Sequence, residues 1–272
     1  TASDGMTELP IELAGINTSG TEGELYFKAD TISSSTDTTF YIYYGNSAAS
    51  AYAQNATYGE NNVWNNGYVL VEHMDDLTTS SVENSEGSPD GTKTSANNPI
   101  ESTTGKIYEA QDFSGDSIAH TDILGGQSQM SFSAWINADN LTGSGDTATY
   151  GYTIFGISPS GAPYTWLTAG GTGYTDEFRF CAYSNSTSCT GTTNADIVTG
   201  TWYHVSVTAV DGASTTVRVN GVERASFNNA GDGTLGTNFT LSDLRPTRGI
   251  NFDGKIDAVR VSNVVRSNAW RD

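Results

Sequence analysis

Hydrophobic and polar residues alternate with a period of two along most of the chain. Such alternation is typical of β-strands that have one buried and one solvated face. The segments that show it are short, rich in β-branched or aromatic residues and bounded by Gly, Asn, Asp or Ser. They are Phe40–Tyr44, Tyr68–Met74, Ser131–Ile136, Thr153–Ile157, Glu177–Tyr183, Trp202–Val210 and Lys255–Ser262. In the segment from Trp202, the pattern predicts a buried face with Tyr203, Val205, Val207 and Ala209 and a wet face with His204, Ser206 and Thr208.

Turn signals separate these segments. Asn220-Gly221 stands between TTVRV and VERAS, and it predicts a hairpin with a two-residue type I′ turn. No amphipathic helix longer than a turn or two can be drawn. Many short strands with such turns predict an all-β fold, a two-sheet antiparallel jelly-roll sandwich rather than an α/β enzyme.

The composition changes near residues 46–62, where the chain becomes small and polar (SAASAYAQNATYGENN). We therefore expect a small β unit with a connector at 1–61 and a main domain at 62–272. The first unit is too small to bury a core of its own. It packs on the main domain, lacks an upstream part or contributes its strands to a neighbouring copy, and the sequence leaves these three options open.

The chain is strongly acidic. It has 12 Lys+Arg and 31 Asp+Glu among 272 residues, a net charge of −19. Residues 1–178 hold 3 of the basic and 23 of the acidic residues (3 − 23 = −20), and residues 179–272 hold 9 and 8 (9 − 8 = +1). Such acidity disfavours nucleic acid and anionic membranes as partners and favours cations, neutral ligands or proteins. No apolar run is long enough for membrane insertion, and residues 1–30 lack a leader pattern, so the chain reads as a mature or excised form.

Two further patterns bear on the compartment. Cys181 and Cys189 have a spacing suited to bridging the two arms of a hairpin; the alternatives are a disulfide, which implies an oxidising compartment, and two reduced, buried thiols. Asn-x-Ser/Thr sequons occur at Asn17, Asn55, Asn140, Asn185 and Asn238, so glycosylation is expected if the source modifies such sites. Both patterns favour an extracellular or cell-surface protein.

Three blocks resemble a known family when taken together. SFSAWINADN, TWYHVSVTAVDGASTTVRVNGVERAS and FDGKIDAVRVSNVVRSNAWRD, preceded by GKIYEAQDFSGDSI, are similar to laminin-G-like domains of the concanavalin A-like lectin and glucanase superfamily. The resemblance covers about residues 63–272. Upstream, FYIYYGNSAAS and VWNNGYVLVEHMDD resemble the end of an uncharacterised domain that often precedes such domains in microbial surface proteins.

The resemblance implies a two-sheet jelly roll, often with a structural calcium ion. Calcium in related domains often links the loop after the first strand to the last strand, which here implies Asp75, Asn84, Asp90 and Asp257 as ligands, with Asp253 as a further candidate. The alternative is that these are turn residues, because Asp90-Gly91 and Asp253-Gly254 are ordinary turn pairs. By the resemblance, Trp135 and Trp202 occupy structural positions, so neither is nominated as a ligand-binding residue.

Catalytic patterns are missing from the sequence. Glucanases of this fold carry paired Glu residues on one strand, Glu-x-Asp-x-Glu or Glu-x-Asp-x-x-Glu, and the chain has neither. His73, His120 and His204 are far apart in sequence and stand in no Gly-x-Ser-x-Gly or His-Glu-x-x-His motif. We therefore expect a non-catalytic protein.

Aromatic residues suggest a ligand face. Sugar rings stack on flat aromatic rings, and Tyr164 and Trp166 stand two apart in a predicted strand, with Tyr174 nearby. They form a binding platform if that face is open, and core if it is closed. The sequence thus favours an adhesion or carbohydrate-binding module of a microbial surface protein that binds glycans or surface proteins. The alternative is a structural subunit of an extracellular filament or surface layer, whose N-terminal unit is completed by a copy of itself.

Overall fold

The computed structural model describes residues 1–16, 23–29, 31–76, 79–87, 89–95, 98–102, 104–144, 146–158, 164–184, 189–192, 195–229, 234–243 and 249–271. The chain divides into two compact units. The first comprises residues 1–66 and 85–88, and the second comprises residues 67–84 and 89–272. Within the described ranges, no helix is long and apolar enough to cross a membrane.

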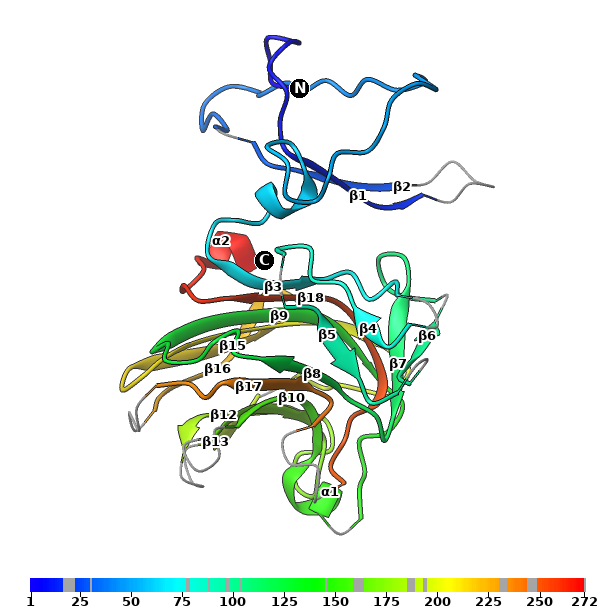
Figure 1. Ribbon diagram of the computed structural model, residues 1–272. Coiled ribbons are helices and arrows are strands. Elements are labelled where there is room, and N and C mark those ends of the chain that lie inside the picture. Colours follow the sequence, from blue (N-terminus) through cyan, green and yellow to red (C-terminus); the bar gives the residue numbers. More distant parts are fainter. Residues whose placement is uncertain are drawn as a thin grey trace. The chain divides into compact units, whose positions relative to one another are not determined.

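The second unit is a sandwich of two antiparallel sheets, which Figure 1 shows as stacked layers. Sheet I has the strand order β16-β15-β14-β9-β18-β7-β6, and β3 also pairs with β18. Its strands are β3 (Tyr68–Glu72), β6 (Ile100–Ser102), β7 (Ala110–Ser114), β9 (Gln129–Ala138), β14 (Trp202–Val210), β15 (Ser214–Val219), β16 (Val222–Asn228) and β18 (Asp253–Ser262). The predicted jelly-roll fold class is confirmed.

Sheet II has the order β13-β12-β11-β10-β17-β8-β5-β4. Its strands are β4 (Ser81–Val82), β5 (Gly91–Lys93), β8 (Ile118–Thr121), β10 (Tyr152–Ser158), β11 (Tyr164–Ala169), β12 (Phe178–Ser184), β13 (Cys189–Gly191) and β17 (Asn238–Leu241). Two short helices, α1 (Asp146–Tyr150) and α2 (Asn268–Arg271), complete the unit. Both sheets also join strands that are far apart in sequence, such as β9 with β18 and β8 with β17, as in jelly rolls.

The core lies between the two sheets. Phe132 of sheet I packs against Phe155 of sheet II with ring centroids 4.4 Å apart, and Phe155 also contacts Phe180 and Phe239. All four side chains are at most 1% exposed. Burial of such rings is the main stabilising term of the sandwich.

The outer face of sheet I is less wet than the alternation predicts. His204 is half-buried, but Ser206 is fully buried and Thr208 is 5% exposed. The C-terminal segment lies over this part of the sheet, where Ser131 Oγ donates to Val264 O (2.8 Å) and accepts from Arg266 N (2.9 Å). The prediction of a wet face is therefore wrong at Ser206 and Thr208, because a segment distant in sequence covers part of it.

The first unit contains the hairpin β1 (Ile11–Ile16) and β2 (Gly23–Phe27), and the 3-10 helix η1 (Glu60–Asn62). One side of the hairpin is closed by Trp64, whose Nε1 donates to the buried Glu12 carboxylate (2.5 Å) and whose ring lies 5.0 Å from Tyr26.

The predicted strand Phe40–Tyr44 is wrong. Residues 40–44 form no strand, although Thr1 and Tyr41 exchange two backbone hydrogen bonds of 2.7 and 3.2 Å. Tyr43 adds one contact, from its hydroxyl to Gly5 O (2.9 Å). One bonded pair does not make a ladder, so the apolar alternation of this segment reflects extended backbone without a neighbouring strand.

Candidate functional site: a tryptophan groove on sheet I

A row of side chains crosses the outer face of sheet I. Trp135 of β9 is the direct cross-strand partner of His204 in β14 and of Asp257 in β18. Because side chains alternate across a sheet, these three share the face opposite the buried Ala134, Ile136 and Val205. The rings of Trp135 and His204 lie 5.3 Å apart, tilted by 58°.

The predicted hairpin turn stands at one end of this row. Asn220 and Gly221 have φ values of 49° and 75°, as a type I′ turn requires, and β15 pairs with β16 on either side. Asn220 Oδ1 accepts a hydrogen bond from His204 N (2.9 Å), and Asn220 N donates to His204 O (2.8 Å). The hairpin prediction is confirmed, and the turn is anchored beside His204.

Asp257 holds a loop against the other end of the row. Its Oδ2 accepts hydrogen bonds from Lys106 N (2.6 Å) and Ile107 N (2.8 Å). A Cβ on the preceding Gly105 would meet Glu109 O at 2.1 Å, so only glycine fits this turn. The fixed loop places the Lys106 ammonium over the Trp135 ring, 4.9 Å from its centroid, within the range of a cation–π interaction.

The C-terminal helix α2 contributes a third tryptophan. Trp270 Nε1 donates to Tyr68 Oη (2.9 Å), and the Arg266 guanidinium lies 4.3 Å from the Tyr68 ring centroid and 5.2 Å from that of Trp270. Burial lowers the pKa of Arg266 from its ordinary value. These three residues are thereby fixed by stacking and a hydrogen bond, although they come from the two ends of the sandwich domain.

These elements surround a groove of about 580 Å³, which we call the tryptophan groove. It is lined by Lys106, Trp135, Trp202, His204, Asn220, Gly221, Arg260 and Trp270. The three tryptophans and His204 are half-buried, and Lys106 and Asn220 are exposed. Flat aromatic walls with hydrogen-bonding groups between them suit a ligand that has an apolar face and polar edges.

This site was not predicted from the sequence. Trp135 and Trp202 were assigned to structural positions because of the resemblance, yet both line the groove. The alternation of WYHVSVTAV does contain a usable signal, because Trp202 and His204 fall opposite Val205 and Val207. What the sequence does not show is that a loop and a C-terminal helix build walls around that face.

The aromatic platform expected on β11 is not open. Trp166 is 7% exposed and packs with Cys181 and Ile250, with the half-buried Tyr150 against them. Tyr174 lies under the Arg179 guanidinium at 5.0 Å. The side chain of Tyr164 falls outside the described residues. Trp166 is therefore a core residue, and its nomination as a ligand-binding residue is wrong.

The residues expected to bind calcium are largely engaged in other contacts. Asn84 Oδ1 accepts from Val71 N (3.0 Å), Asn84 N donates to Asp90 Oδ1 (3.1 Å), and Asp257 holds the loop at Lys106. Asp253 begins β18, and Asp75 follows β3. Within the described residues, no three His, Cys, Asp or Glu side chains are placed to hold a metal ion. Structural calcium stays a prediction, which a comparison of melting with calcium and with chelator tests.

Cys181 is disulfide-bonded, and its backbone partner across the β12–β13 pair is Cys189. Of the sequons, Asn55 and Asn238 are exposed and Asn140 is half-buried in a turn where its Oδ1 accepts from Thr142 N (3.0 Å). Asn17 and Asn185 lie outside the described residues. Glycosylation of these asparagines stays a prediction.

The structure also forms a histidine–carboxylate pair that the sequence did not indicate. His120 Nε2 lies 3.1 Å from Glu72 Oε1, and both side chains are 0% exposed. Gly91 packs against this pair, where a Cβ would come within 2.7 Å of Glu72 Oε1 and His120 Cε1. The pair is enclosed in the sandwich interior, so it joins the two sheets and does not face a ligand.

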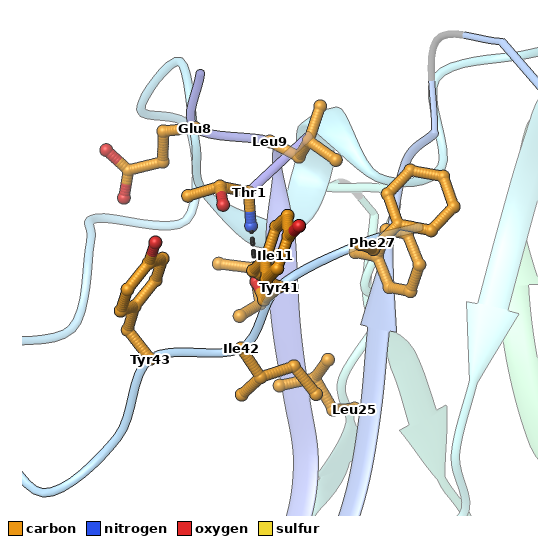
Figure 2. Close-up of a pocket in the computed structure, with 10 residues that line it drawn as sticks. Thr1, Glu8, Leu9, Ile11, Leu25, Phe27, Tyr41, Ile42 and Tyr43 are labelled. Atoms are coloured by element: carbon orange, nitrogen blue, oxygen red, sulfur yellow. Dashed lines mark hydrogen bonds between the residues drawn. The ribbon is translucent and has the colours of Figure 1, made fainter. Parts of the chain in front are cut away.

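A smaller hollow of about 150 Å³ lies in the first unit, shown in Figure 2. It is formed where the hairpin meets the extended chain from Phe40, and it is lined by Thr1, Glu8, Leu9, Ile11, Leu25, Phe27, Phe40, Tyr41, Ile42 and Tyr43. Several of these apolar side chains are exposed, among them Ile11 (37%), Phe27 (40%) and Ile42 (68%). The hollow is thus an apolar surface open to water.

Solved structures similar to this chain share its fold. Domain 4 of AbnA, a GH43 extracellular arabinanase from Geobacillus stearothermophilus, in complex with arabinotriose, aligns with a TM-score of 0.56 and 21% identity over 75% of this chain and 96% of that domain. The binding domain of Paraclostridial Mosquitocidal Protein 1 aligns with a TM-score of 0.56 and 11% identity, covering 75% and 51% of the two chains.

Trypanosoma rangeli sialidase in complex with sialic acid also aligns with a TM-score of 0.56, at 13% identity, and here 75% of this chain covers 32% of the sialidase. A comparison with curated protein sequences found no match.

The family model for the concanavalin A-like lectin/glucanases superfamily matches residues 112–270. This range contains β9, β14 and β18, which carry the tryptophan groove. The chain therefore belongs to the concanavalin A-like lectin and glucanase superfamily.

Proposed function

We propose that the chain is a carbohydrate-binding module of an extracellular or cell-surface protein and that saccharides bind in the tryptophan groove. The observation that carries the proposal is the set of three half-buried tryptophans around a groove of about 580 Å³. The C–H face of a pyranose packs on such rings, and Asn220, His204 and the cationic side chains offer hydrogen bonds to its hydroxyl groups.

Two further observations support this proposal. The walls of the groove are held in place by the Asp257 bonds to the loop at Lys106 and by the Trp270–Tyr68 hydrogen bond. A preformed site loses less entropy on binding. In addition, a domain of the same fold in the arabinanase AbnA is described in complex with arabinotriose. The proposed role is binding and adhesion, without catalysis.

The test compares Trp202→Ala with Tyr174→Ala. Binding is first surveyed on a broad glycan array, with arabinotriose included, and the affinity for the strongest hit is then measured by calorimetry. Loss of a central aromatic contact costs about 2 kcal/mol, roughly 30-fold in affinity. We expect this loss for Trp202→Ala only, since Tyr174 lies outside the groove. No hit on the array, or equal affinities of the two variants, would contradict the proposal.

A second function is favoured by a different observation in the first unit. One face of the β1–β2 hairpin exposes Ile11 (37%), Leu13 (56%) and Phe27 (40%). A two-stranded sheet with an open apolar face is only marginally stable in water. We infer that a strand of a neighbouring copy covers this face, which makes the chain a structural subunit of an extracellular filament or surface layer.

This second function is tested by the assembly state. Native protein is examined by size-exclusion chromatography and negative-stain microscopy over a range of concentrations and salt. We expect polymers, and Leu13→Lys abolishes them because it places a charge on the covered face. Monomers under all conditions would remove this function and leave carbohydrate binding untouched.

A further inference from the structure

Positive charge gathers at the tryptophan groove of an otherwise acidic protein. Among the described residues, the lining includes Lys106 and Arg260 but no Asp or Glu. A third cation, Arg218, lies at the rim, where its Nη1 donates to Gly221 O (2.5 Å) and its Nη2 is 3.8 Å from Glu223. The chain has only 12 Lys+Arg against 31 Asp+Glu, so a lining without acidic side chains sets this surface apart.

In the part of the chain that the structure describes, no carboxylate competes for the Lys106 ammonium. Its side chain is exposed, and the structure shows its ammonium over the Trp135 ring with no Asp or Glu in ion-pair distance among the described residues. The nearby Asp257 is 1% exposed, and its Oδ2 is used by two backbone N–H groups. The ammonium is thus held at the groove wall by its loop and can accept an anionic partner.

The net charge of −19 does not prevent an anionic ligand from binding in the groove. Of the strands that line the groove, β14 and β18 come from residues 179–272, whose net charge is +1, and β9 carries no charged residue. At physiological salt the Debye length is about 8 Å, so the acidic residues elsewhere are largely screened from a ligand in the groove. The charged side chains that the described lining presents to a ligand are those of Lys106 and Arg260.

We propose that the tryptophan groove selects acidic saccharides, whose carboxylate or sulfate group binds Lys106 and Arg260 while the sugar ring packs against the tryptophans. The inference rests on the proposed function and adds the ligand class to it. Carboxylate and sulfate share the required chemistry, a negative charge with several hydrogen-bond acceptors on a sugar ring.

The test uses matched pairs of saccharides that differ only in charge. The pairs are oligogalacturonate and its methyl ester, sialyllactose and its methyl ester, and a sulfated chondroitin oligosaccharide and its desulfated form. Affinities of the whole protein are measured by calorimetry in about 0.15 M salt. We expect the acidic member of at least one pair to bind roughly 10-fold more tightly or better, with the preference decreasing as salt is raised. The first two pairs report carboxylate recognition and the third reports sulfate recognition.

Variants then assign the preference to the groove. Lys106→Met keeps an apolar stem over Trp135 and removes the charge, so it reduces the preference for the acidic saccharide. Lys106→Arg keeps the charge and therefore keeps the preference. Lys28→Met, which removes a half-buried lysine outside the groove, leaves the preference unchanged. Equal affinities within every pair overturn this inference and leave carbohydrate binding standing. Absence of binding to all six probes and to a broad array of neutral glycans overturns both.

Discussion

Trp166 and Trp202 lie on the outer faces of the two sheets, one on each, but their surroundings differ. Trp166 is 7% exposed and is closed over by Ile250 and Tyr150. Trp202 is half-buried at the wall of the tryptophan groove, near Trp270 of the C-terminal helix. In both cases a segment from outside the sheet crosses the face. On sheet II the segment seals the indole into a small second core, and on sheet I it leaves room for a ligand.

The comparison shows that strand alternation separates the inner from the outer face of a sheet, but an outer face is not always a surface. Whether a ring there stabilises the fold or binds a ligand depends on what loops and termini place on top of it. The predictions that follow test whether stability belongs to the Trp166 face and binding to the Trp202 face.

The largest effect is expected for Trp166→Ala. Removing a buried indole leaves a cavity and costs about 3–5 kcal/mol of unfolding free energy. Chemical denaturation measures it, and Trp202→Ala is the matched control, since the same truncation at a half-buried position costs less. The comparison fails if the two substitutions destabilise the protein equally.

Reduction of the disulfide is expected to come next. Cys181 is disulfide-bonded and belongs to the same small core as Trp166. Opening a loop of this length removes about 2–3 kcal/mol of stability. Melting with and without a reductant measures the loss, and saccharide affinity in the groove should stay constant wherever the protein remains folded. A change in affinity on reduction would mean that the two faces are coupled.

The sequence predicts the sandwich well because its strands are local features. Trp202–Val210 was predicted with the bounds that β14 has, and the Asn220-Gly221 turn forms as expected. The candidate site was not predicted, because it depends on contacts between residues far apart in the chain. Asp257 shows this clearly: it was nominated as a calcium ligand, and its carboxylate accepts N–H groups about 150 residues upstream. The prediction of a strand at Phe40–Tyr44 fails for a similar reason, since alternation cannot show whether another strand lies beside the segment, and none does among the described residues.

The third prediction concerns saccharide binding in the tryptophan groove. Trp202→Ala should lower saccharide affinity by about 2 kcal/mol, while a Trp166→Phe variant, which keeps an aromatic ring in the sealed core, should bind as the wild type does. Calorimetry with one saccharide measures both, and circular dichroism confirms that each variant is folded. Weaker binding by Trp166→Phe would reverse the assignment of the two faces.

The last prediction concerns a third region, the half-buried carboxyl groups of Asp76 and Glu109, and it extends the comparison from aromatic rings to charged groups. Burial raises the pKa of Asp76 to about 7, and the nearby Asp75 and Glu72 contribute, whereas a hydrogen bond from Glu83 N and the charge of Lys93 oppose the shift. Burial together with Glu101 similarly raises the pKa of Glu109 to about 7. Limited access to water therefore favours the neutral carboxyl in the folded state.

The direction of the pH dependence follows from the raised pKa. The folded protein binds the Asp76 proton more tightly than the unfolded chain does, so this stabilisation is complete below about pH 4 and is lost as the pH rises through about 7. Asp76→Asn keeps a neutral side chain at every pH, so its stability relative to the wild type should rise between pH 4 and 8. Urea denaturation at several pH values measures the difference. Asp122→Asn is the control for replacing a carboxyl by an amide at an exposed position. Asparagine tolerates the φ of 60° found there. A constant difference between Asp76→Asn and the wild type would show that water reaches this carboxyl as freely as it reaches the groove.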